Sequence, residues 1–283
     1  MAQSITNAFV TLFDAEVKQA YQAESVLRSA VRLRFGVNGN TYKFPKLGKG
    51  SATVRIPQTD VTPLNVTYSQ VTATMSDYNA AEYSDIFHQA KVNFDERSEL
   101  VQVVSKAIGR RLDQLIIDAL SGASSPNTVA NTVVTSGSAA ASNLNVGKLI
   151  AAKKAMDAKN VPLDDRHILI HANSLAGLLG DERAISGDYA SIKGLVSGEL
   201  NSFLGFKFIT IGDRDEGGLS IDGSSDRNVY AFHRSAIGMA ENMAQKTEIN
   251  YVPEKTSFLV NSMFSAGSIA IDDEGITEVT CRE

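Results

Sequence analysis

The chain has 283 residues, 43% of them hydrophobic, and its 27 basic and 32 acidic side chains give a net charge of −5. This length supports about two domains with sizeable cores, whereas the acidic balance disfavours a general DNA-binding protein, because phosphate contacts need positive charge. A single cysteine, Cys281, excludes an internal disulfide and is typical of a reducing compartment. No basic stretch opens the N-terminus and no apolar run is long enough to span a bilayer, so we expect a soluble protein made in the cytoplasm.

The first segment, Ser4–Val31, has the period of a helix. Its apolar residues recur at steps of three or four, with one polar interruption at Glu24. The apolar positions are Ile5, Phe9, Leu12, Phe13, Val17, Ala20, Tyr21 and Leu27. We expect this helix to dock on another surface.

The next segment, Asn38–Asp77, has the pattern of β structure, with short strands predicted at Thr41–Phe44 and Thr53–Ile56. Its prolines favour edge positions. The alternation of apolar residues shifts by one between Tyr68 and Val71, which predicts a bulge. Large apolar residues are sparse here, and a two-stranded hairpin alone is marginal in water. We therefore expect this arm to be ordered by packing on another subunit.

No acidic residue lies between Glu24 and Asp60, although acidic residues cluster later in the chain. Seven basic side chains occupy this interval and are candidate inter-subunit contacts: Arg28, Arg32, Arg34, Lys43, Lys46, Lys49 and Arg55. If they meet an acidic neighbour, their charge steers association and sets the register of the contact. If they form a solvated face instead, they contribute little, since most surface pairs are worth under ~1 kcal/mol.

The clearest predicted element is one long amphipathic helix over Asn93–Leu120. Asn93 is a candidate N-cap and Glu96 completes a capping box, apolar residues follow at steps of three and four, and Gly122 ends the helix. At 1.5 Å per residue the helix is roughly 40 Å long. Taken alone, such a helix fits the core of an α/β enzyme as well as it fits a structural protein.

The low-complexity segment Ser121–Asn145 is predicted to be a loop or a short hairpin. Strands and helices then alternate over about 145–246, which favours a compact α/β domain. The predicted elements are a helix from Val146 that ends before Pro162, strands at His167–His171, Gly205–Gly212 and Asn228–His233, and a helix at Asn173–Leu179 capped by Asn173 or Ser174.

The last segment, Thr247–Glu283, returns to strand patterns, with a hairpin turn predicted at Asp272–Gly275. This tail can pair with the strands that flank the long helix. The α/β domain would then be an insertion in the first domain.

Motifs that carry chemistry are scarce. His167 and His171 are four residues apart, but zinc needs three or four convergent ligands, so ordinary polar roles are favoured over a metal pair. The chain has no nucleophile elbow, phosphate-binding loop or dinucleotide fingerprint, and Cys281 has no base nearby in sequence. We expect no catalytic residue, no metal and no cofactor.

Taken in order, these parts resemble the major capsid protein of tailed bacteriophages, an α+β protein of the Hong Kong ninety-seven capsid fold. The resemblance covers essentially the whole chain. It rests on Tyr83–Asp95 running into ERSELVQ, Leu178–Ala190, Gly205–Gly212, Val229–Glu241 and Ala270–Val279.

The resemblance implies a domain plan and an assembly. The implied parts are an N-terminal arm (1–37), an extended β-hairpin loop over an adjacent subunit (38–77), a peripheral domain (78–144 and 247–283) with a spine helix (93–120), and an axial domain (145–246). Many copies would form pentamers and hexamers of an icosahedral shell around double-stranded DNA, which the acidic wall would not bind specifically. The protein would be part of the virion and be made in the host bacterial cytoplasm.

Two departures from relatives bear on partners. Some relatives carry a long N-terminal scaffolding segment, whereas the fold here is predicted to begin almost at Met1, so we expect a separate scaffolding protein or a cleaved precursor, beside a portal and decoration proteins. Some relatives crosslink a lysine of the extended loop to a neighbouring asparagine; Lys46 and Lys49 lie in the right region, but no acceptor is evident. The alternatives are an encapsulin-like compartment of the same fold, which encloses a cargo enzyme, and a soluble α/β enzyme.

Overall fold

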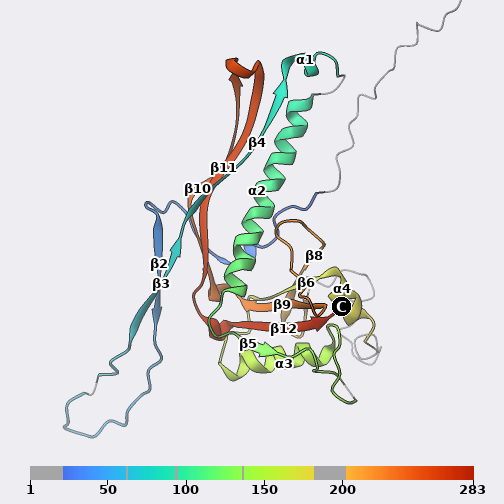
Figure 1. Cartoon of the computed structure of the whole chain (residues 1–283). Helices are drawn as coiled ribbons and strands as arrows, with labels where there is room; N and C mark the ends of the chain where they lie inside the picture. Colours follow the sequence, from blue (N-terminus) through green and yellow to red (C-terminus); the bar gives the residue numbers. More distant parts are fainter. Residues whose placement is uncertain (1–21, 62, 93–94, 136, 182–201) are drawn as a thin grey trace, which may run out of the picture.

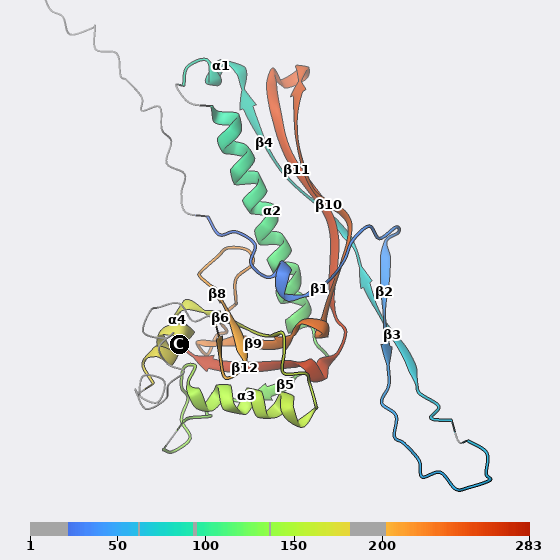
Figure 2. The same cartoon turned by 180° about the vertical axis from the view of Figure 1, so that it is seen from behind.

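The computed structural model describes residues 22–61, 63–92, 95–135, 137–181 and 202–283. In this part of the chain, a long helix lies along a narrow four-stranded sheet, and a six-stranded sheet lies at one end of both (Figure 1). A two-stranded hairpin projects from the junction and is seen from both sides in Figures 1 and 2.

The narrow sheet has the strand order β1-β10-β11-β4. Its strands are β1 (Arg32–Arg34), β4 (Ser76–Asp85), β10 (Ile237–Val252) and β11 (Ser257–Ala270). β10 and β11 form a long antiparallel hairpin that turns at Pro253–Lys255, and β4 pairs antiparallel with β11 along its whole length. The predicted pairing of the tail beside the long helix is therefore confirmed for β11.

The long helix α2 (Glu96–Ser121) packs on this sheet through its apolar stripe. The buried apolar residues are Val104, Ile108, Leu112, Ile116, Ile117 and Leu120. The predicted helix is confirmed, and Gly122 is its C-cap. Its start is corrected: Asp95 stands at the N-cap position, Asn93 lies outside the described residues, and the Glu96 carboxylate accepts a hydrogen bond from Ser84 Oγ at 2.8 Å.

The six-stranded sheet has the order β5-β12-β9-β6-β8-β7. Its strands are β5 (Asn127–Val129), β6 (Arg166–His171), β7 (Ser202–Phe203), β8 (Phe206–Ile211), β9 (Asp226–His233) and β12 (Ile276–Arg282). Helices α3 (Val146–Ala158) and α4 (Ala172–Leu179) contribute buried apolar residues to its core. The strands and helices predicted between 145 and 246 are thus confirmed in the described residues.

Three local predictions in this sheet are corrected. The cap of α4 is His171, whose Nδ1 accepts a hydrogen bond from the Asn173 N–H at 3.2 Å, rather than Asn173 or Ser174. The segment Ser121–Asn145, predicted to be a loop or a short hairpin, is a loop after α2 except for the strand β5, which pairs parallel with β12 and not in a hairpin within the described residues. The turn Asp272–Gly275 is also no hairpin turn, because it leads from β11 in the narrow sheet to β12, which pairs with β9.

The projecting hairpin consists of β2 (Thr41–Leu47) and β3 (Tyr68–Thr74) in regular antiparallel register, so the predicted bulge is wrong. The apolar alternation shifts because Tyr68 lies on the solvent face and is 80% exposed, whereas Ala73 on the other face is buried. The strand predicted at Thr53–Ile56 is also absent from the described residues, where this stretch has no regular structure.

The described part of the N-terminal segment is not an α-helix. It runs irregularly to a short 3-10 turn at Arg28–Ala30 and then enters β1. The reason is a contact distant in sequence: the backbone N–H groups of Val26 and Leu27 donate to the carboxylate of Asp113 on α2, at 3.1 Å each, and not to carbonyls of a helical turn. The helix predicted before Gln22 lies outside the described residues. None of the described helices combines the length and the apolar character that crossing a membrane requires.

Candidate assembly surfaces

The hairpin presents apolar side chains that nothing in the described chain covers. Val54 is 93% and Val61 is 88% exposed. Further exposed apolar residues of the same arm are Leu47, Ile56, Leu64 and Tyr68. Exposed apolar surface of this extent marks an interaction site, so the arm is the first candidate assembly surface.

The root of the hairpin is fixed by an apolar cluster. Phe44, Ala73 and Met75 pack there with Ala240 of β10 and Ile271. The contact is close, because a Cβ added at Gly238 would lie 2.7 Å from the Phe44 ring. The root of the arm therefore belongs to the core of its own subunit, while the rest of the arm projects.

Two ion pairs connect the outer end of this root to the acidic turn after β11. Lys46 Nζ lies 2.8 Å from Asp272 Oδ1, and Lys49 Nζ lies 2.7 Å from Glu274 Oε2. The hydrogen bond from Lys49 lowers the pKa of Glu274 and raises that of Lys49. These two lysines thus pair with acidic residues of their own chain, where the sequence left open an acidic neighbour or a solvated face.

Two of the other five candidate contact residues also have contacts within the chain. Arg28 pairs with the buried Glu241 of β10 at 2.7 Å, and the Arg32 guanidinium lies 6.0 Å from the centre of the Phe44 ring. Within the described ranges, Arg34, Lys43 and Arg55 are exposed and make no ion pair. The structure therefore divides the seven predicted residues into four with partners in their own subunit and three that remain free.

A second exposed apolar surface lies at the far end of the narrow sheet. Its exposed residues are Tyr83, Ile86, Phe87, Ile249 and Tyr251. Cation–π contacts reinforce this end, with Lys255 Nζ 4.0 Å from the Tyr83 ring and the Arg97 guanidinium 4.8 Å from the Phe258 ring. The two candidate surfaces thus lie at opposite ends of the subunit (Figure 1).

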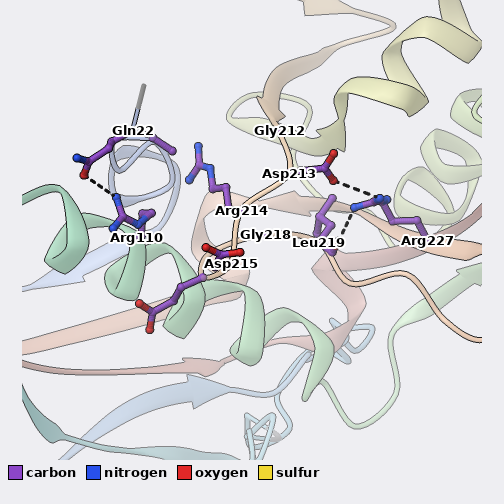
Figure 3. Close-up of a pocket in the computed structure, with 11 residues that line it drawn as sticks. Gln22, Arg110, Gly212, Asp213, Arg214, Asp215, Gly218, Leu219 and Arg227 are labelled. Carbon is purple, nitrogen blue, oxygen red and sulfur yellow. Dashed lines mark hydrogen bonds and ion pairs between the residues drawn. The ribbon is translucent and has the colours of Figure 1, made fainter. Parts of the chain in front are cut away.

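A polar cavity of about 520 Å³ lies where α2, the N-terminal segment and the segment after β8 meet (Figure 3). Arg214 is in its wall, and its guanidinium also pairs with the buried carboxylate of Asp113 at 3.0 Å. Arg110 also lines the cavity and donates to Gln22 Oε1 at 3.3 Å. These contacts tie three segments together. The signal for Asp113 in the sequence is an acidic residue directly after Leu112, within the apolar stripe of the helix.

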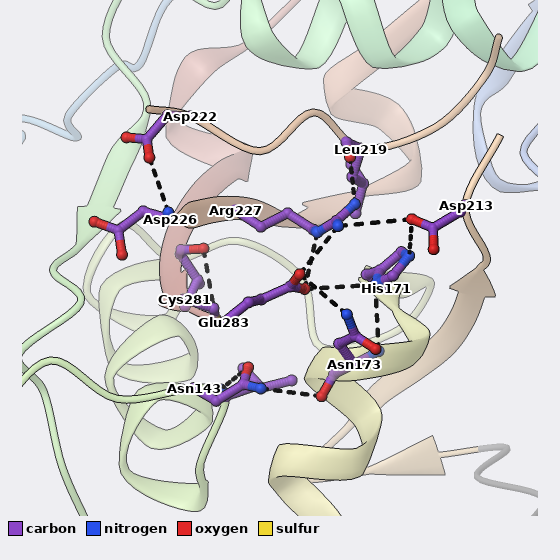
Figure 4. A network of polar contacts seen from close by, with 12 residues as sticks. Asn143, His171, Asn173, Asp213, Leu219, Asp222, Asp226, Arg227, Cys281 and Glu283 are labelled. Atoms are coloured by element: carbon purple, nitrogen blue, oxygen red, sulfur yellow. Dashed lines mark hydrogen bonds and ion pairs between the residues drawn. The ribbon is translucent and has the colours of Figure 1, made fainter. Parts of the chain in front are cut away.

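A second polar network lies at the ends of the inner strands β12, β9, β6 and β8 of the six-stranded sheet (Figure 4). The Glu283 carboxylate accepts hydrogen bonds from Arg227 at 2.8 and 3.0 Å and from Asn173 at 3.1 Å. Burial raises the pKa of Glu283, but these hydrogen bonds lower it, and the lowering prevails. His171 lies between Glu283 and Asp213, at 3.4 and 3.1 Å. The network fastens the end of β12 to β9 and α4.

The two networks are built on ion pairs between buried side chains, Arg214 with Asp113 and Arg227 with Glu283. Among the described residues, no three histidine, cysteine, aspartate or glutamate side chains converge as metal ligands. Burial raises the pKa of the Cys281 thiol to about 11, which leaves it a poor nucleophile. His167 stacks on Phe232 with 5.8 Å between ring centres, whereas His171 caps α4. The two histidines therefore have separate roles.

Comparison with known proteins agrees with this geometry. The sequence matches the family described as phage capsid protein over residues 5–283. No curated protein matches it. Among solved structures, the head structure of Helicobacter pylori bacteriophage KHP40 is similar with a TM-score of 0.78 at 14% identity, covering 99% of this chain and 98% of that chain.

Two further structures are similar over nearly the whole chain. The capsid structure of cyanophage P-SCSP1u has a TM-score of 0.77 at 15% identity and covers 100% of this chain and 96% of its own. A chain of Mycobacterium phage Che8 has a TM-score of 0.72 at 16% identity and covers 98% of both. These likenesses show the fold, which is the Hong Kong ninety-seven type that the sequence predicted. The chain belongs to the phage capsid protein family and is a major capsid protein.

Proposed function

We propose that copies of this chain form pentamers and hexamers that close into an icosahedral head around double-stranded DNA. The observation that carries this proposal is the projecting arm, whose Val54 and Val61 side chains are 93% and 88% exposed. An apolar arm that its own subunit leaves uncovered needs a neighbour to cover it. A shell provides one, because each subunit meets the next through a heterologous contact that closes by rotation.

The parts of the chain have distinct proposed roles in this shell. Residues 1–37 form the N-terminal arm, and 38–77 form the extended loop that lies over the adjacent subunit. The peripheral domain consists of β4, α2, β10 and β11, and the axial domain is built on the six-stranded sheet. Because β5 and β12 pair within that sheet, we assign them to the axial domain although they lie outside 145–246. Strand β10 pairs with β11 from Ile237 onward, so we assign it to the peripheral domain although its first part lies inside 145–246.

The charge pattern supports two further parts of the proposal. A net charge of −5 suits a wall that encloses DNA without specific binding. Arg34, Lys43 and Arg55 are exposed and make no ion pair with any residue that the structure describes, so they can contact a neighbour. Arg28, Arg32, Lys46 and Lys49 already have partners in the same subunit, so a crosslink from Lys46 or Lys49 would first have to displace an ion pair.

The proposed partners follow from this role. A scaffolding protein, a portal and decoration proteins would act with the shell, the mature protein would reside in the virion, and synthesis would take place in the host bacterial cytoplasm. The role is structural, and the polar networks around Asp113 and Glu283 serve the fold.

Electron microscopy of the purified protein, with mass spectrometry and nucleic-acid staining, tests the proposal. Closed shells with five- and six-fold capsomers are expected when the chain is produced with its scaffold, and DNA is expected in particles from infected cells. A species that never exceeds a tetramer at any salt concentration would overturn the shell. Particles that contain a cargo enzyme and no DNA would favour a cellular compartment instead.

A further inference from the structure

The turn Asp272–Gly275 is a fixed point where several segments meet. It joins β11 of the narrow sheet to β12 of the six-stranded sheet. The segment after α2 holds it, because the Ser125 N–H donates to Asp273 Oδ2 and the Asn127 side chain donates to the Glu274 carbonyl, both at 3.1 Å. The orientation of this turn therefore follows the orientation of the two sheets.

The hairpin contacts this fixed point twice. Lys46 in β2 reaches Asp272, and Lys49, three residues further along the arm, reaches Glu274. Next to these pairs, a cavity of about 600 Å³ is lined by Lys46, Asp272, Glu274 and the segment from Ser124. One ion pair would leave the arm free to rotate about it, whereas two successive pairs define a direction.

The direction of the arm matters because the arm is long. From Lys46 to the far end of the loop near Gln58 an extended chain spans at most roughly 40 Å. A rotation of about 5° at the root then moves the end of the arm by about 3 Å. The apolar cluster around Phe44 fixes the position of the root, so the contacts beyond that cluster decide the angle.

We propose that the Asp272–Gly275 turn is a two-point ionic latch that sets the angle of the β2–β3 hairpin against the body of the subunit. The latch makes the direction of the arm depend on the relative position of the two sheets, through the turn that joins them. This inference rests on the proposed function only in one respect, namely that the arm so directed reaches a neighbouring subunit.

The strength of the latch is modest in one subunit. An exposed ion pair shifts a conformational equilibrium by about two- to fivefold, and two pairs on one rigid arm act together. In a closed shell every subunit carries the same arm, so a small shift in angle recurs at each contact. Because the Lys46–Asp272 pair is only half-buried and the Lys49–Glu274 pair is exposed, high salt weakens the latch.

Distance measurement between two spin labels tests the latch in unassembled subunits. Labels are placed through Asp60→Cys in the loop and Lys154→Cys on α3; the native Cys281 is buried and does not compete. The tested variants are Lys46→Asp, and Lys46→Asp combined with Asp272→Lys, which exchanges the two charges. Lys43→Asp is the matched control, since Lys43 lies on the same strand and makes no ion pair within the described residues.

The wild type is expected to give one narrow distance distribution. Lys46→Asp should increase the population at distances outside this distribution about two- to fivefold. The exchanged pair should restore the wild-type distribution, and Lys43→Asp should leave that distribution unchanged. A wild-type distribution in ~1 M salt should resemble that of Lys46→Asp. Circular dichroism confirms that each variant is folded, and Lys46→Met with Asp272→Asn serves where a reversed charge disturbs folding.

Equal distributions for the wild type and Lys46→Asp would overturn the latch, and so would an exchanged pair that stays as broad as the single variant. Neither result depends on assembly. Failure of the wild type to form shells would instead overturn the proposed function, so the two failures are distinguishable.

Discussion

Asp113 on α2 and Arg214 after β8 form a buried ion pair, with 3.0 Å between Oδ2 and Nη1. The same carboxylate accepts hydrogen bonds from Ser25 Oγ at 2.8 Å and from the Leu27 N–H at 3.1 Å. A buried carboxylate needs such an ion pair and hydrogen bonds, because an unpaired charge in the interior is strongly unfavourable. One side chain thus holds the N-terminal segment and the segment before β9 on the long helix.

The first prediction concerns this carboxylate. Asp113→Ala removes the partner of Arg214 and leaves the cation buried, so we expect the free energy of unfolding to fall by about 3–5 kcal/mol. Denaturant titration followed by circular dichroism measures the change. Asp118→Ala is the matched control on the exposed side of the same helix and should change stability by under ~0.5 kcal/mol. Equal effects of the two substitutions would contradict the assigned role.

The second prediction concerns acid stability. Burial lowers the pKa of His167 and of His233 below the ordinary value of 6.5. The charged groups that face them are Asp164, Asp165, Arg166, Lys207 and Arg234. Below about pH 6.5 the unfolded chain therefore binds more protons than the folded one. The stability that the neutral rings contribute is fully present above this pH and is lost as the pH falls through the folded pKa values.

The measurement is the denaturant midpoint between about pH 7.5 and about pH 5.5. The wild-type midpoint should decrease over this range, and His167→Gln with His233→Gln should show a smaller decrease. His88→Gln, at an exposed histidine of α1 (Ile86–Gln89), serves as the matched control. If the double variant loses as much stability on acidification as the wild type, other groups control the profile.

The third prediction concerns Cys281. The thiol is buried, and burial raises its pKa to about 11, so the reactive thiolate is scarce at neutral pH. We expect native protein to resist a thiol reagent such as a disulfide dye, and denatured protein to react at the rate of a free thiol. Absorbance of the released dye measures both rates. Fast labelling of native protein would show that the end of β12 opens.

Some features of this fold are readable in the sequence and others are not. The long helix is readable because its apolar period and its terminal glycine are local signals. The pairing of β12 with β9 is not a local signal. The turn at Asp272–Gly275 resembles a hairpin turn in sequence, but the strands on its two sides belong to different sheets and do not pair with each other. The helix predicted for the N-terminal segment does not form over its described residues because Asp113, 86 residues from Leu27, binds the backbone there and replaces the helical hydrogen bonds.

The candidate contact surface is also predictable only in part, because its charge pattern is a local signal but its ion pairs are not. The acid-free interval from Glu24 to Asp60 identified the basic arm. Charge patterning alone cannot say which lysines meet acids of their own chain. Lys46 and Asp272 are 226 residues apart, and only the folded root of the hairpin brings them together.

The fourth prediction concerns the contact between β11 and the end of β3. A Cβ added at Gly267 would lie 2.1 Å from the Thr74 carbonyl oxygen, a backbone atom that cannot move freely. Gly267→Ala should therefore displace the root of the hairpin and cost about 1–3 kcal/mol, as overpacking does. Thermal unfolding measures the cost. Gly223→Ala, where the added Cβ meets nothing within 4 Å, is the matched control and should leave the melting temperature nearly unchanged.

The fifth prediction concerns assembly. Lys43 and Arg55 are exposed on the arm and make no ion pair within the described residues, so reversing both charges should leave the subunit folded while slowing its docking on an acidic neighbour. Lys91→Glu with Lys154→Glu changes net charge equally at exposed sites off the arm and is the matched control. Light scattering during assembly should show a severalfold slower rise for the arm variant alone, and the difference should shrink as salt screens the contact. If both variants assemble at the same rate, the free basic residues of the arm play no part in docking, and the exposed apolar residues around Val54 must direct it.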